Sequence, residues 1–132
     1  MNLIINTPSS SNIYPISSLE ELENKLLELE NVDMAEVWLN SGNEPTIAMF
    51  TNDKRAFLMY LPKLGSAGFT SRANSSEEIN YELVPIYMKD SQGDEKPSNW
   101  FISLNTGLEA LKYFFSNKEK LVSISWYDDS KK

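Results

Sequence analysis

The chain contains no cysteine and no histidine among its 132 residues. Without cysteine there is no disulfide, no thiolate nucleophile and no cysteine zinc site. Without histidine the chain lacks the side chain best suited to proton transfer near neutral pH and the commonest transition-metal ligand. These absences exclude most designs of hydrolases and metalloenzymes. We therefore predict that the protein is not an enzyme and has no catalytic residue, cofactor or metal.

Positive charge is also scarce, because 12 lysines and arginines face 19 acidic residues and the net charge is -7. Such a surface repels the phosphates of nucleic acids and anionic membranes. The first residues, Met1 to Asn6, have no basic region and no long apolar run, which excludes a secretory signal or membrane anchor there. We expect a cytoplasmic protein that binds neither nucleic acid nor a membrane directly. Acidity that serves only solubility explains the charge equally well.

Length and composition predict one domain over residues 1–132, since 41% of the residues are hydrophobic and no linker interrupts the chain. Residues 130–132 form an expected frayed tail. No internal repeat or low-complexity tract is present.

Two segments have helix-start signals. Ser17 or Ser18, each followed three residues later by a glutamate, begins the first helix with a capping-box spacing, and Thr106 with Glu109 begins the second. The second helix is expected to end near Asn117. Apolar residues at helical spacing define the face that each helix buries: Leu19, Leu22, Leu26 and Leu29, widened by Leu27, in the first, and Leu108, Leu111 and Phe115 in the second.

Strand patterns outnumber helix patterns. Met34–Leu39, Thr46–Thr51 and Arg55–Leu61 follow one another through connections too short for a crossover helix, which predicts an antiparallel meander with a doubly covered third strand. Further strands are expected at residues 2–6 (a possible edge), Ile79–Met88 (interrupted by Pro85), Trp100–Leu104 and Leu121–Tyr127, with loops at Thr7–Pro15 and Asp90–Ser98. The predicted fold is α+β, a single layered domain with a mostly antiparallel sheet of five to six strands and two main helices.

Three carboxylate pairs could serve acid–base chemistry or bind a hard cation: Glu77 with Glu78, Asp94 with Glu95, and Asp128 with Asp129. Adjacent residues on a strand point to opposite faces, so a pair converges on one substrate atom only where a loop turns it. Solvated surface charge is the favoured interpretation, and an enzyme that uses such a pair is a distant alternative.

Aromatic residues beside charges point to protein recognition instead. The segment Gly65–Arg72 has two glycines that can take conformations closed to other residues, and it carries Phe69 where no strand or helix pattern explains it. Trp126 ends an apolar alternation beside two aspartates, which suits an anchor for a basic protein surface. Trp38 and Trp100 are expected in the core.

Several of these segments, in this order and spacing, resemble a family of bacterial immunity proteins that are encoded beside polymorphic toxins, often of the nucleic-acid deaminase type. The resemblance covers about residues 44 to 129 through Glu44-Pro45, Arg55–Leu61, Gly65–Arg72, Pro97–Trp100, Leu108–Phe115 and Ile124–Asp129. Two features depart from the family pattern. Ser66 replaces a usual aspartate, and a longer turn, Lys89–Lys96, replaces an asparagine-glycine turn.

The resemblance implies an immunity protein, an antitoxin that neutralises its cognate toxin by binding and occluding the active site of a nucleic-acid deaminase or nuclease. A variable acidic turn suits recognition of one particular toxin. The alternative function is a non-enzymatic adaptor or regulatory module that binds other proteins. The candidate partner-binding residues are Phe69, Arg72, Asp90, Asp94, Glu95, Trp126, Asp128 and Asp129.

Overall fold

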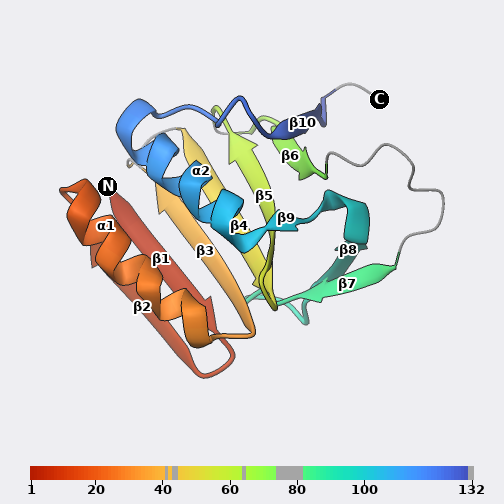
Figure 1. The fold of residues 1–132 in the computed structure, drawn as a ribbon, viewed down its shortest axis with the longest axis horizontal. Coiled ribbons are helices and arrows are strands. Elements are labelled where there is room, and N and C mark those ends of the chain that lie inside the picture. The colour runs from red at the N-terminus through yellow and green to blue at the C-terminus, as the bar shows by residue number, and fades with distance from the viewer. Residues whose placement is uncertain (41, 43–44, 64, 74–81, 131–132) are drawn as a thin grey trace.

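The computed structural model describes residues 1–40, 42, 45–63, 65–73 and 82–130. In this part of the chain the main sheet has eight strands in the order β10-β6-β5-β4-β3-β1-β2, with β9 paired to β5 (Figure 1). The strands are β1 (Asn2–Thr7), β2 (Ser10–Pro15), β3 (Met34–Asn40), β4 (Thr46–Asn52), β5 (Arg55–Leu61), β6 (Phe69–Arg72), β9 (Ile102–Ser103) and β10 (Ser125–Asp128).

A second sheet pairs β7 (Leu83–Ile86) with β8 (Asp94–Pro97). The helices are α1 (Leu19–Leu26), continued by the 3-10 helix η1 (Leu27–Asn31), and α2 (Leu104–Asn117), with a 3-10 turn η2 (Ser98–Trp100). The predicted α+β class, with a mostly antiparallel sheet and two main helices, is confirmed. The sheet is larger than the five to six strands expected.

The predicted meander is present, because β3, β4 and β5 pair antiparallel in sequence order. A tight turn at Asp53 and Lys54 joins β4 to β5, and β5 has the predicted bounds. Successive residues of a strand point to opposite faces. Leu58 accordingly lies in the main core and Phe57 in a second cluster, so β5 is covered on both sides as expected.

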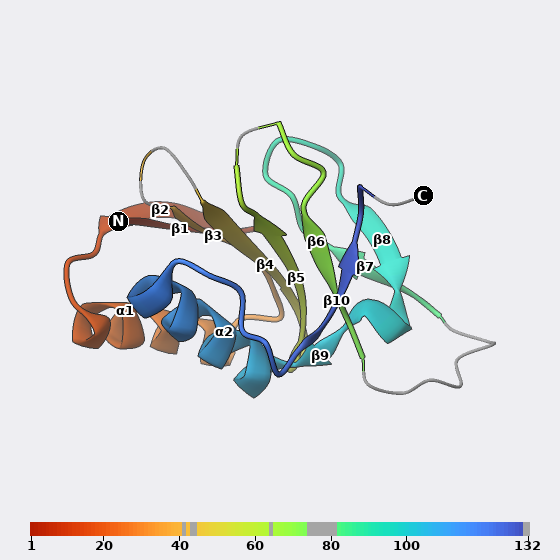
Figure 2. The ribbon, with the colours of Figure 1, turned by 90° about the horizontal axis from the view of Figure 1, so that it is seen from above.

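The two faces of the sheet are covered differently. α1 and α2 lie on one face (Figure 2), where Leu111 and Phe114 of α2 pack among Leu3, Val37 and Leu58 of the strands in the main core. On the opposite face Phe50 and Phe57 pack with Val84 and Ile86 of the β7–β8 hairpin and with Phe101. We call the side packed by the helices the helix-covered face.

Both helices begin at a serine. In α1, Ser18 is the N-cap and forms the predicted capping box with Glu21, whereas Leu27 is 57% exposed and does not widen the buried stripe. In α2, Ser103 is the N-cap and accepts a hydrogen bond from the Thr106 N–H, so the prediction of a start at Thr106 was wrong. The predicted end at Asn117 is confirmed.

Several strand predictions need correction. Ser10–Pro15, predicted as part of a loop, is strand β2, because all of its residues pair with the apolar β1. β1, predicted as a possible edge, is therefore an inner strand between β3 and β2. Trp100 lies on η2 and not on a strand. The predicted strand Leu121–Tyr127 is shorter, because Leu121 to Ile124 precede β10, and Val122 is 81% exposed.

The predicted strand Ile79–Met88 is shorter in the described residues, where β7 covers Leu83–Ile86; residues 79–81 lie outside the described residues. Pro85 lies within this two-stranded hairpin, and its carbonyl accepts a hydrogen bond from Asn52 Nδ2 at 2.7 Å. The expected Asp90–Ser98 loop contains β8.

Candidate partner-binding site

The eight predicted contact residues fall into two groups. Pairing of β6 with β10 brings one group together at the end of the sheet, and we call it the C-terminal corner: Phe69, Arg72, Trp126, Asp128 and Asp129. The second group lies on the β7–β8 hairpin and the turn before β8, and we call it the acidic hairpin: Asp90, Asp94 and Glu95.

The register divides the C-terminal corner between two faces. Asp128 lies opposite Phe69, and Trp126 lies opposite Ser71, so Phe69, Trp126 and Asp128 share the helix-covered face. Arg72 points to the other face. A partner that contacts all of them has to wrap around the sheet edge formed by β10.

Phe69 is the first residue of β6, so the expectation that no strand explains its position was wrong. It is half-buried, its ring centroid lies 6.2 Å from that of Tyr60, and the Lys120 Nζ lies 4.3 Å from its ring centroid. Trp126 is also half-buried and packs against the main core, while its Nε1 donates to the Leu121 carbonyl at 2.9 Å. Both aromatic rings therefore offer only part of their surface to a partner.

The backbone conformation and the neighbours of Gly68 explain why a glycine precedes β6. Its φ is +76°, and a Cβ built there would lie 2.5 Å from the Tyr60 carbonyl oxygen and 2.6 Å from Leu61 Cδ2. The backbone of β6 approaches β5 too closely for a side chain at this position. The Gly68 carbonyl also accepts the Asp129 N–H at 2.9 Å, which ties the end of β10 to the start of β6.

Arg72 is held between two aromatic rings. Its guanidinium carbon lies 3.9 Å from the Trp100 ring centroid and 4.8 Å from that of Tyr127. Nη1 donates to Thr70 Oγ1 and to the Ser71 carbonyl. Burial lowers the pKa of Arg72, while the negative charge of Asp129 acts in the opposite direction. Arg72 stays protonated at neutral pH because an arginine titrates far above that range.

The two aspartates have different surroundings. Asp128 Oδ1 accepts hydrogen bonds from the Ser130 N–H at 3.0 Å and the Ser130 hydroxyl at 2.6 Å. Asp129 Oδ2 is buried and has no hydrogen-bond partner within the described ranges, and the same holds for Ser66 Oγ in the preceding loop. A buried oxygen without a donor is costly, so this position is held at the expense of some stability.

All three residues of the acidic hairpin are exposed. Asp94 accepts the Glu95 N–H at 2.7 Å and forms an ion pair with Lys96 at 3.1 Å. These contacts lower the pKa of Asp94, the hydrogen bond from Glu95 contributing most. Asp94 and Glu95 are neighbours on a strand and so point apart, as expected. Glu77 and Glu78 lie outside the described residues.

A buried glutamate, which sequence reasoning missed, fixes the acidic hairpin to the sheet. Glu36 of β3 is 7% exposed, and its Oε1 accepts from Asn6 Nδ2 at 3.0 Å and from the Lys89 N–H at 3.2 Å. Lys89 Nζ also donates to Ser11 Oγ. A single acid within the apolar run of β3 was the available signal, because an acid inside a buried strand needs partners.

Among the described residues no three acidic side chains form a group that could hold a metal ion. In the same part of the chain neither helix is long and apolar enough to cross a membrane. A scan against protein-family models and a search of curated proteins found no match to this chain.

Proposed function

We propose that this protein is a cytoplasmic immunity protein, which neutralises a cognate toxin by binding it and covering its active site. The toxin is a nucleic-acid deaminase or nuclease. One observation carries the proposal: segments that resemble the immunity family, and that lie far apart in the sequence, are neighbours in the fold. β5 pairs with β6, β6 pairs with β10, and Ser71 of β6 bonds to Trp100 of η2.

Binding without catalysis suits these residues. A toxin that acts on nucleic acid needs a basic groove for phosphates. The C-terminal corner and the acidic hairpin offer exposed or half-exposed carboxylates, at Asp128 and Asp129 and at Asp94 and Glu95, and the whole chain has a net charge of -7. Opposite charges accelerate association and make it sensitive to salt. Tyr127, which is 44% exposed, adds an aromatic contact at the same corner.

The proposal is tested by co-expression with the toxin domain encoded beside this gene. We expect growth to be restored and the two proteins to purify together. If growth is not restored and the two proteins do not purify together, although each is folded and expressed, the proposal is wrong.

Charge-neutral variants test which surface binds. We expect Asp128→Asn with Asp129→Asn, or Asp94→Asn with Glu95→Gln, to lower the association rate about tenfold at low salt and much less at about 0.5 M salt. The matched control is Glu20→Gln with Glu109→Gln, which removes the same charge from exposed positions on the two helices. If the control slows association equally, net charge acts alone and these two surfaces are not the contact.

A further inference from the structure

A pocket opens where the sheet divides beside β5. One edge of β5 pairs with β6 at Met59 and Tyr60 and with β9 at Arg55 and Ala56. β6 and β9 diverge between these pairings, and the pocket beside them has a volume of about 510 Å³. Its lining includes Lys54, Arg55, Arg72, Phe101, Ser103 and Ser123.

Three of the lining residues are cations in a protein with an excess of acids. Met59 of β5 is opposite Thr70 of β6. Arg55 and Arg72 are each an even number of residues from this pair, so both point to the same face of the sheet. Within the described ranges, ion pairs form at Lys96, Lys112 and Lys120 but not at Lys54, Arg55 or Arg72. Like charges that gather in one place repel each other, and a bound anion would lower that cost. At Arg72 the negative charge of Asp129 already offsets part of it.

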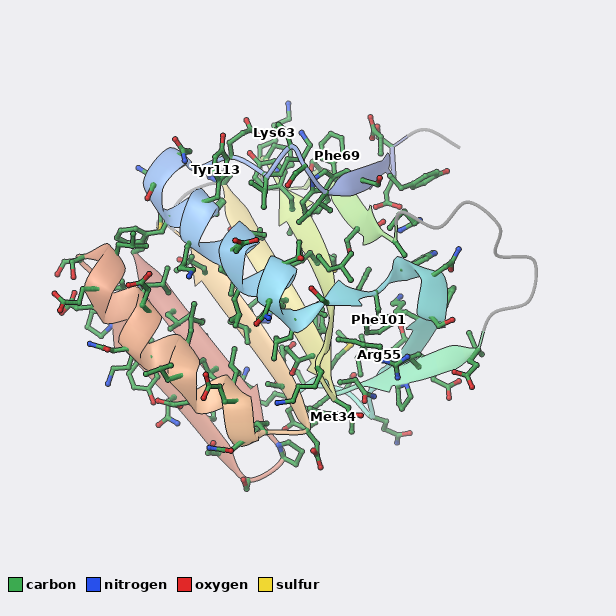
Figure 3. All side chains as sticks on the ribbon, viewed as in Figure 1. Met34, Arg55, Lys63, Phe69, Phe101 and Tyr113 are labelled. Atoms are coloured by element: carbon green, nitrogen blue, oxygen red, sulfur yellow. The ribbon has the colours of Figure 1, made fainter. Side chains whose placement is uncertain are left out.

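The two guanidinium groups are held in place before any ligand binds. Arg72 lies between Trp100 and Tyr127, and only its Nη1 donates hydrogen bonds within the described residues. Its Nε and Nη2 carry further donors. Arg55 lies over the Phe101 ring at 5.7 Å (Figure 3). Guanidinium groups that contact aromatic rings are suited to bind oxygen anions.

Lys54 occupies a backbone position that favours another residue. Asp53 and Lys54 have φ values of +46° and +66°, as a two-residue hairpin turn requires, and glycine is the usual second residue of such a turn. The Leu104 N–H donates to the Lys54 carbonyl at 2.9 Å and fixes the turn against the start of α2. The chain thus accepts backbone strain at a residue that lines the pocket, which is a pattern typical of functional sites. The Lys54 Nζ donates to the Glu30 carbonyl at 3.5 Å.

We propose that this pocket binds a small oxyanion, and we assign its ligand to the class of phosphate monoesters. Three cations match a dianion better than a single carboxylate, and the Ser103 and Ser123 hydroxyls add hydrogen-bonding groups. The volume exceeds that of a bare phosphate, and the half-buried Ile102 offers apolar contact to an attached organic group. A long nucleic acid is disfavoured by the net charge of -7.

The test is a nuclear magnetic resonance titration of the full chain with inorganic phosphate, phenyl phosphate and acetate at equal ionic strength. We expect saturable shifts at the amides of Lys54, Arg55 and Arg72 with both phosphates, tighter for phenyl phosphate, and no saturation with acetate. Equal, non-saturating shifts with all three anions would show charge screening only and overturn the proposal. Saturable shifts elsewhere would overturn it too.

Lys54→Gly separates binding from folding, because it should raise the melting temperature while it weakens phosphate binding about tenfold. Lys63→Gln is the matched control: it removes one positive charge near the opposite end of β5 (Figure 3) and should change the dissociation constant less than twofold, roughly. A Lys54→Gly variant that binds phosphate as well as the original protein would contradict the assignment. These experiments use the isolated protein, so their outcome is independent of toxin binding.

Discussion

In the middle of the sheet β3, β4 and β5 pair along their whole lengths, whereas toward the C-terminal corner the outer edge of β5 is divided between β6 and β9. The first region is stabilised by large apolar side chains, among which Leu58, Leu111 and Phe114 are completely buried. The second depends on individual polar contacts. Ser71 Oγ accepts the Leu58 N–H at 2.9 Å and donates to the Trp100 carbonyl at 2.8 Å.

The difference shows how a regular sheet can carry an irregular site. Where β6 leaves β5, the ladder ends, and a side-chain hydroxyl replaces the missing backbone partner of Leu58. The pocket lies beside this interruption, and Arg72 is one of its lining residues. We infer that the apolar region supplies most of the stability, which allows several cations to gather beside the C-terminal corner.

The largest expected effect tests the apolar region. Phe114→Ala removes a fully buried ring that packs edge-on against Tyr60 at 6.2 Å. We expect a loss of about 3–5 kcal/mol in the free energy of unfolding, measured by urea denaturation. Phe115→Ala, at the half-buried next position, is the control and should cost less. A loss below about 1 kcal/mol for Phe114→Ala would contradict the comparison.

An intermediate effect is expected at the corner. Ser71→Ala leaves the Leu58 N–H and the Trp100 carbonyl without their partner at a position that is 0% exposed. We expect a loss of about 1–3 kcal/mol, with faster hydrogen exchange at the Leu58 amide.

Thr51→Val is the matched control for Ser71→Ala. Thr51 Oγ1 in β4 is buried without a hydrogen-bond partner in the described part of the chain. Replacing it with a side chain of similar shape should leave stability unchanged or raise it. If both variants cost the same, loss of a buried hydroxyl as such is responsible, and the bridge at Ser71 has no special role.

The sequence predicted the apolar region better than the corner. The bounds of β5, the α1 start at Ser18 and the α2 end at Asn117 follow local signals, namely an apolar run, a capping box and helical spacing. β2 was missed because its serines and asparagine lack a strand pattern, and its pairing with β1 alone makes it a strand. The start of α2 was misplaced because two capping residues, Ser103 and Thr106, compete locally.

The candidate site was predicted only as a set of separate residues. Phe69 and Asp128 are opposite each other through the pairing of β6 with β10, which no local pattern indicates. The pocket depends on β9, a strand of only Ile102 and Ser103, which aligns Arg55 with Ser103. Long-range pairing of short strands has weak local signals, so Lys54 and Arg55 were not recognised as site residues.

The smallest expected effect tests whether a charge at the N-terminal end of α1 adds to the stability that apolar burial supplies. Glu21 accepts hydrogen bonds from the Ser17 N–H, the Ser17 hydroxyl and the Ser18 N–H, which lower its pKa, the bond from the Ser17 N–H contributing most. A lowered folded-state pKa adds stability above the unfolded value of about 4.3, and this stability is lost as the pH falls through the folded value. We therefore expect Glu21→Gln to lower the melting temperature slightly at pH 7, with a difference that shrinks as the pH falls through the lowered folded-state pKa.

Ser18→Ala is the companion variant at the same helix end, because it removes a neutral hydroxyl that accepts the Glu21 N–H at 3.1 Å. Its cost should persist at every pH, measured by circular dichroism, since that hydrogen bond does not depend on the charge of the carboxylate. A Glu21→Gln difference that is the same at low and neutral pH would show that the glutamate acts through its shape and not its charge. In that case α1 depends on packing even at its exposed N-terminal end. That result would strengthen the contrast with the charged C-terminal corner.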